Sequence, residues 1–143
     1  MCRQLVLAAA ALGLTITGAL AESCGSAPIA PALPTAADIN AKAPAAADAA
    51  KHDAFVEIRN WQNDLKDYRA CLVNVSNGAK RQISGLEAEK DKDKIAGLKA
   101  NAAQATHEYD DSVDMEERVV NEFHAVQAAF CARKDVDKSS CPK

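Results

Sequence analysis

One stretch of the chain decides the fold. Residues 58–86 read IRNWQNDLKDYRACLVNVSNGAKRQISGL, and their apolar residues recur at alternating intervals of three and four. This spacing places them on one side of an α-helix as an a/d heptad stripe. The stripe consists of Ile58, Trp61, Leu65, Tyr68, Leu72, Val75, Ala79, Gln82 and Leu86. It predicts a long amphipathic helix over residues 48–90.

The pair Asn77 and Gly78 interrupts this stretch, because Asn-Gly is typical of a turn. The heptad pattern nevertheless passes through the pair without a shift, which an intervening loop would disrupt. We therefore interpret residues 48–90 as one helix with a weak point at Gly78. Two helices separated at Gly78 are the alternative.

A second stripe follows the polar residues 91–94, DKDK. It consists of Ile95, Leu98, Ala102, Ala105, Tyr109, Ser112, Glu116, Val119, Phe123, Val126 and Phe130. The pattern predicts a second helix over residues 94–134 and an all-α fold, a long antiparallel coiled-coil-like hairpin. With the turn centred near Lys92, Trp61 faces Phe123 across the seam.

The N-terminus has the three-part pattern of a cleavable signal peptide over residues 1–21. Arg3 supplies a positive charge, residues 5–20 carry none, and Ala19 and Ala21 form a small-x-small cleavage site. A retained membrane anchor is the alternative, although the apolar stretch is near the lower limit for a bilayer span. The pattern predicts a mature chain that is periplasmic or secreted, without a membrane span.

Residues 22–47 form a Pro/Ala-rich arm, in which prolines disfavour regular structure. We expect this arm to be extended, apart from a short turn around residues 36–41, and to pack along the first helix over the exposed side of Trp61. The prolines are Pro28, Pro31, Pro34 and Pro44.

Four cysteines remain after the leader: Cys24, Cys71, Cys131 and Cys141. An even number in a small exported chain favours two disulfides, and the spacings do not resemble a zinc site. An extended arm is long enough to bring Cys24 to Cys71, which leaves Cys131 and Cys141 to tether a tail, residues 135–143. The alternative pair Cys71–Cys131 conflicts with the hairpin, since these residues would lie far apart along it.

The most acidic surface lies over residues 107–117. Asp110, Asp114 and Glu117 share one side of the helix and are weak candidates for a divalent cation, although a solvated acidic face is the simpler interpretation. Glu116 and Ser112 lie on the stripe itself, opposite Tyr68 and Leu72. We expect Glu116 to accept a hydrogen bond from a tyrosine hydroxyl and to fix the register of the helices.

The sequence argues against an enzyme and predicts no cofactor. It contains no nucleophile motif and no Gly-rich phosphate loop, and a two-helix rod offers no deep pocket. The histidines His52, His107 and His124 have no metal-binding spacing, so surface positions are expected. The formal net charge of −3 argues against a nucleic-acid partner and gives no reason to expect attraction to anionic lipid.

The combination of motifs resembles a group of small, uncharacterised exported bacterial proteins. The shared features are Cys24-Gly25 before a Pro/Ala arm, the run Tyr68-Arg69-Ala70-Cys71-Leu72, and spaced aromatic residues in the second helix, here Phe123 and Phe130. The resemblance suits a Cys24–Cys71 pair and the hairpin fold, and implies no activity. We therefore expect a protein that acts by contact with a partner or by self-association, for which the unmatched Phe55, Val113 and Val120 are available. A weak cation- or ligand-binding protein is the alternative.

Overall fold

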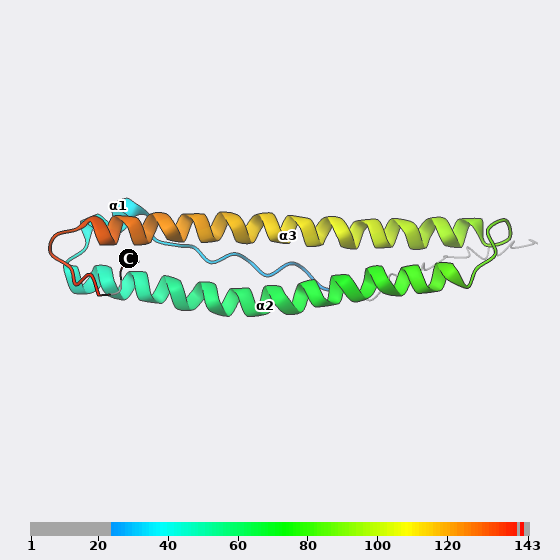
Figure 1. Ribbon diagram of the computed structural model, residues 1–143, viewed down its shortest axis with the longest axis horizontal. Helices are drawn as coiled ribbons and strands as arrows, with labels where there is room; N and C mark the ends of the chain where they lie inside the picture. The colour runs from blue at the N-terminus through cyan, green and yellow to red at the C-terminus, as the bar shows by residue number, and fades with distance from the viewer. Residues whose placement is uncertain (1–23, 140, 142–143) are drawn as a thin grey trace, which may run out of the picture.

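The computed structural model describes residues 24–139 and 141, and every regular element in this part of the chain is an α-helix (Figure 1). The helices are α1 (Ala36–Ala41), α2 (Pro44–Ser84) and α3 (Lys92–Ala132). The prediction of an all-helical fold in which two long helices pack against each other is confirmed. None of these helices is long and apolar enough to cross a membrane. The predicted signal peptide, residues 1–21, lies outside the described residues.

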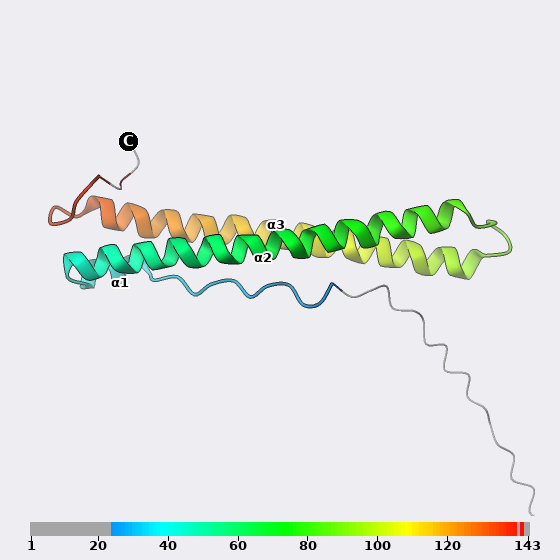
Figure 2. The same cartoon turned by 90° about the horizontal axis from the view of Figure 1, so that it is seen from below.

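α2 and α3 each contain 41 residues, which corresponds to about 60 Å of helix. They lie side by side, and residues 85–91 connect neighbouring ends, so that the two helices run in opposite directions (Figures 1 and 2). α2 continues through Asn77 and Gly78, as the unbroken heptad pattern indicated.

The boundaries of the first long helix differ from the predicted range of 48–90. α2 begins at Pro44, because proline at the first helical position lacks only an N–H group that would have no partner there. It ends before Gly85, whose N–H donates to the carbonyl oxygen of Gln82, and the N–H of the next residue, Leu86, donates to that of Ile83. Asp91 then closes the connection by accepting a hydrogen bond from the N–H of Glu87. The turn therefore precedes Lys92, which is the first residue of α3.

Phe123 contacts the ring of Phe55, with the ring centroids 6.1 Å apart. Trp61, which the sequence placed opposite Phe123, belongs to the same buried cluster and points its indole N–H at the arm. The predicted position of the turn was wrong, because residues 92–94, taken as part of the turn, are the beginning of α3.

The core is a narrow seam between α2 and α3. Among the predicted seam residues, Val75 and Tyr109 are partly buried and the others are buried. The buried ones are Ile58, Trp61, Leu65, Tyr68, Leu72, Val119, Phe123, Val126 and Phe130. Lys51 joins the end of this seam, because its ammonium group lies 3.7 Å from the centre of the Phe130 ring.

The sequence predicted that the arm is extended apart from a short turn around residues 36–41, and the structure has the helix α1 at that turn. Thr35 begins α1 with a capping box: its hydroxyl accepts from the N–H of Asp38, and its own N–H donates to the Asp38 carboxylate. α1 thus extends over the whole of the expected turn, and its Ile39 is completely buried. Only residues 24–34, the extended segment, lie along the long helices, on one side of the pair (Figure 2).

Two disulfides fix the ends of this arrangement. Cys24 is bonded to Cys71, which anchors the extended segment near the middle of α2. Cys131 is bonded to Cys141 and holds the tail against the end of α3. Beside it, the Arg133 guanidinium donates to the carbonyl oxygens of Ile39 and Lys42, at 2.6 and 2.9 Å, so that the end of α3 also binds the link between α1 and α2.

Candidate interaction surface

The extended segment covers one side of the helix pair, and its contacts explain how. The Trp61 indole N–H donates to the carbonyl oxygen of Pro28 over 3.2 Å, and Ala27, Ala30 and Leu33 pack against the core. On the opposite side of the seam, the described part of the chain places only the short tail after α3, at the end where α2 begins (Figure 2). We call that side the open face and define it by Phe55, Val73, Tyr109 and Val113.

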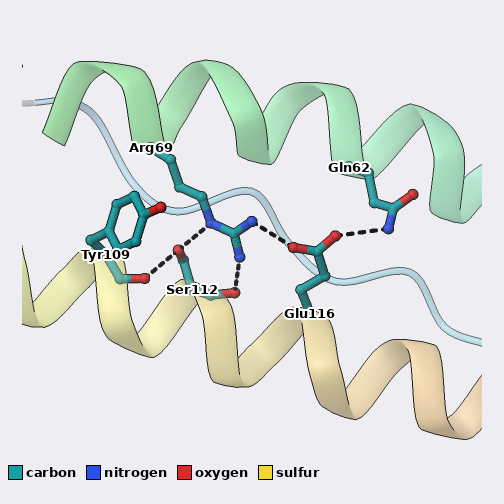
Figure 3. A network of polar contacts seen from close by, with 5 residues as sticks. All are labelled: Gln62, Arg69, Tyr109, Ser112 and Glu116. Carbon is teal, nitrogen blue, oxygen red and sulfur yellow. Dashed lines mark hydrogen bonds and ion pairs between the residues drawn. The ribbon is translucent and has the colours of Figure 1, made fainter. Parts of the chain in front are cut away.

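A polar network forms the centre of the open face, as Figure 3 shows with the extended segment passing behind it. Arg69 on α2 forms an ion pair with Glu116 on α3. The same guanidinium donates to the hydroxyl and to the backbone carbonyl of Ser112, each at 2.7 Å. Gln62 donates to the second carboxylate oxygen of Glu116 at 2.7 Å. The network therefore joins α2 to α3 at two positions along the helices, Gln62 and Arg69.

The surroundings of Glu116 favour its ionised form. The hydrogen bond from Arg69 lowers the pKa of Glu116 below its usual value and outweighs burial, which acts in the opposite direction. The side chains of Arg69 and Glu116 are 18% and 28% exposed, so water screens the pair only in part. Ser112 is itself buried, and its hydroxyl donates to the carbonyl oxygen of Tyr109.

The prediction that Glu116 accepts a hydrogen bond from a tyrosine hydroxyl was wrong. The Tyr68 hydroxyl donates to Glu108, at 2.9 Å, whereas Glu116 binds Arg69 and Gln62. Burial, followed by the hydrogen bond to the Glu108 carboxylate, raises the pKa of Tyr68. Sequence reasoning missed Arg69 and Gln62. The two residues lie seven positions apart, next to the apolar stripe. This heptad spacing of long polar side chains was the sequence signal that could have identified them.

Apolar side chains surround this network. Phe55, Val73 and Val113 are 48%, 44% and 42% exposed, which is high for side chains of their type. A shallow groove of about 250 Å³ runs between the helices next to the network. Its lining includes Leu72, Val73, Ser76, Lys80, Ala105 and Tyr109. The open face is therefore an apolar strip with a polar centre.

The acidic candidates do not form a metal centre. Asp110, Asp114 and Glu117 are all exposed, and the described residues contain no group of three or more His, Cys, Asp or Glu that could hold a metal ion. The neighbouring Asp111 accepts from His107, with 3.0 Å between the two side chains, in an exposed ion pair within one helix. The other two histidines, His52 and His124, are exposed as well.

Comparisons of this chain with protein-family models, with curated proteins and with solved structures find no match. The resemblance to small exported bacterial proteins therefore rests on its sequence motifs alone, and the function has to be argued from the surface itself.

Proposed function

We propose that the mature chain is an exported, non-enzymatic helical-hairpin protein that acts by binding other polypeptides through its open face. The observation that carries this proposal is the exposure of Phe55, Val73 and Val113 beside an apolar groove. Amphipathic helices commonly present such faces to partner helices. Scaffolding, inhibition and assembly all use contacts of this kind.

Export is supported by the leader pattern of residues 1–21 together with the pairing of all four remaining cysteines. Disulfides form and persist in the periplasm and outside the cell, and they are rare in the cytosol. They also suit the architecture, because a single seam between two helices buries little surface. The proposed compartment thus supplies the oxidation that stabilises a thin fold.

The non-enzymatic part of the proposal rests on the side chains of the open face. Its polar centre holds one ion pair, one amide and one hydroxyl, and the Arg69 guanidinium is engaged by Glu116 and Ser112. The network shows no nucleophile paired with a general base, which is the arrangement that covalent catalysis needs. A binding role fits these groups because hydrogen-bonded polar centres fix the register of helix contacts.

Site-specific photo-crosslinking in the periplasm tests the proposal. A photoreactive amino acid at position 113 should give covalent adducts with another polypeptide, because Val113 lies on the open face. The same group at position 121, exposed on α3 and lining a depression on the outer surface of that helix, is the matched control and should give none. Equal yields from both positions, or no adduct at position 113, would overturn the proposal.

A further inference from the structure

The open face is a continuous strip along the helix pair, and its length suits a partner that is also a helical rod. A second shallow groove, lined by Lys66, Arg69 and Val73, shares Val73 and Tyr109 with the first. The two grooves therefore form one strip across the middle of the helix pair. The tail after α3 lies on the same side, at the end of the molecule where α2 begins (Figure 2). Its Asp137 is close enough to Lys51 to interact with it electrostatically, and Lys51 lies about one helical turn before Phe55.

The area of this strip is enough for a stable contact. From Phe55 to Lys80 the strip is about 40 Å long at 1.5 Å per residue, and two helices are about 20 Å wide. This gives roughly 800 Å² for each partner, which is the usual contribution of one protein to a specific interface.

The charges beside the strip are arranged with opposite signs on the two helices. Arg59, Lys66 and Lys80 are exposed on α2, spaced by multiples of seven, so they share the side of the helix that carries Val73. On α3, Asp110 lies three residues before Val113 and Glu117 lies four residues after it, and both are exposed. The edge of α2 is therefore basic, and the edge of α3 is acidic.

We infer that the open face binds a second copy of this chain, and that the two copies form a four-helix bundle around a two-fold axis parallel to the helices. The inference rests on the proposed function and names the partner. Each α2 then packs on the α3 of the other copy, with Val73 and Val113 in the contact. A self-complementary patch is what a two-fold dimer requires.

The charges select this arrangement over the other two-fold dimer. An axis across the rod would place α2 on the α2 of the second copy, with Lys66 and Lys80 close to like charges. An axis along the rod places the basic edge of α2 on the acidic edge of α3. Across the two helices, Gln62 contacts Glu116 and Arg69 contacts Ser112. Lys66 lies between Gln62 and Arg69 on α2, so it is at the same height along the rod as Val113 on α3. Lys66 then lies between Asp110 and Glu117 of the second copy.

The polar network suits the centre of such an interface. Its ion pair is neutral as a unit, and the described residues have no buried side-chain nitrogen or oxygen without a hydrogen-bond partner. Further burial therefore leaves no charge of this network unpaired. A polar layer of this kind commonly fixes the register and the number of helices in a bundle, at some cost in affinity.

Sedimentation equilibrium of the mature chain, exported with its own leader so that both disulfides form, tests the inference. The expected mass is that of a dimer at micromolar concentration. Val113→Lys should weaken dimerisation at least tenfold, because it places a charge in the apolar strip and level with Lys66 of the second copy. Asn121→Lys adds the same charge on the outer surface of α3 and should leave the dimer unchanged. A monomer at all concentrations up to several hundred micromolar would overturn the inference.

A charge reversal tests the orientation. Lys66→Glu should weaken the dimer, because it faces Asp110 and Glu117 of the second copy. Adding Glu117→Lys to the same chain should restore affinity. If Lys66→Glu instead tightens the dimer, α2 lies on α2 and the inferred arrangement is wrong. Circular dichroism of each variant establishes that the helices are intact.

The same experiments separate this inference from the proposed function. A monomeric chain whose position 113 crosslinks to a different protein leaves the proposed function standing and ends the inference. Adducts of two identical chains at position 113, together with the dimer mass, support both. A monomer without adducts ends both.

Discussion

Arg69 on α2 and Glu116 on α3 form an ion pair across the two long helices, beside two further hydrogen bonds from the same guanidinium to Ser112. The pair is a rigid link between helices that otherwise meet through apolar side chains. Its partial burial makes the loss of one partner more costly than the pair itself is stabilising.

Arg69→Met should lower the free energy of unfolding by about 1–2 kcal/mol. The substitution leaves the partly buried Glu116 carboxylate with Gln62 as its remaining partner in the network, and removes the donors to Ser112. Urea unfolding followed by circular dichroism measures the effect. Arg118→Met removes an exposed arginine from the outer surface of α3 and is the control, which should change stability by less than about 0.5 kcal/mol. Equal effects of the two variants would show that the network contributes nothing.

The contribution of Glu116 should depend on pH. Its pKa is lowered from 4.5 in the folded state, so the unfolded chain binds this proton more readily than the folded one. The stabilisation that ionised Glu116 provides is therefore complete above the pKa of the unfolded chain. It is lost as the pH falls through the lower pKa of the folded chain. The Tm difference between the native chain and Glu116→Gln should be largest near neutral pH and shrink in acid. The exposed Glu122→Gln should show no comparable trend.

The Cys24–Cys71 disulfide should stabilise the fold more than Cys131–Cys141. The two bonds close loops with sequence separations of 47 and 10, and longer loops lose more entropy when closed. The chain-entropy relation gives about 4 kcal/mol for the first and about 3 kcal/mol for the second. Paired Cys→Ser variants, compared by urea unfolding, measure the difference.

Trp61 reports separately on the extended segment in these variants. Its indole binds Pro28, so release of the segment should shift its fluorescence to the red when Cys24 and Cys71 are replaced. The paired variant of Cys131 and Cys141 should keep the native emission. An unchanged spectrum in both would mean that the segment stays in place without its disulfide.

Gly78→Ala should raise the free energy of unfolding by about 0.5–1 kcal/mol, because glycine is unfavourable inside a helix. A Cβ atom at position 78 would have the Arg81 guanidinium 4.0 Å away as its nearest neighbour, so no clash offsets the gain. Gly85→Ala, at the end of α2, is the control and should give a smaller change. Thermal unfolding of the two variants measures how much each substitution changes the stability.

The long helices could be read from the sequence because a heptad stripe is a local property. Trp61, Leu65 and Leu72 identify their side of α2 whatever packs on it. The ends of the helices depend on a few hydrogen bonds, such as those of Gly85 and Asp91, and small changes there alter every facing pair. The predicted position of the turn was wrong for this reason.

The polar centre of the open face was harder to predict. Arg69 and Gln62 look like ordinary surface residues, because long polar side chains flank most amphipathic stripes. Only the register of α2 against α3 brings them to Glu116, and that register was not available from either stripe alone. α1 was expected only as a short turn around residues 36–41, because it lies within a run of prolines and alanines that favours extended structure.

The Cys24–Cys71 bond also determines how the molecule carries mechanical load. A force applied at the N-terminus enters α2 directly at Cys71, because the covalent link bypasses residues 25–70. The Cys131–Cys141 bond does the same for the tail. Tension between the two ends therefore passes through the remaining part of α2, the connection at residues 85–91 and α3. The extended segment, α1 and the first two thirds of α2 are shielded from stretching. Of the residues that define the open face, Phe55 lies in the shielded part, whereas Val73, Tyr109 and Val113 lie in the helices that carry the load.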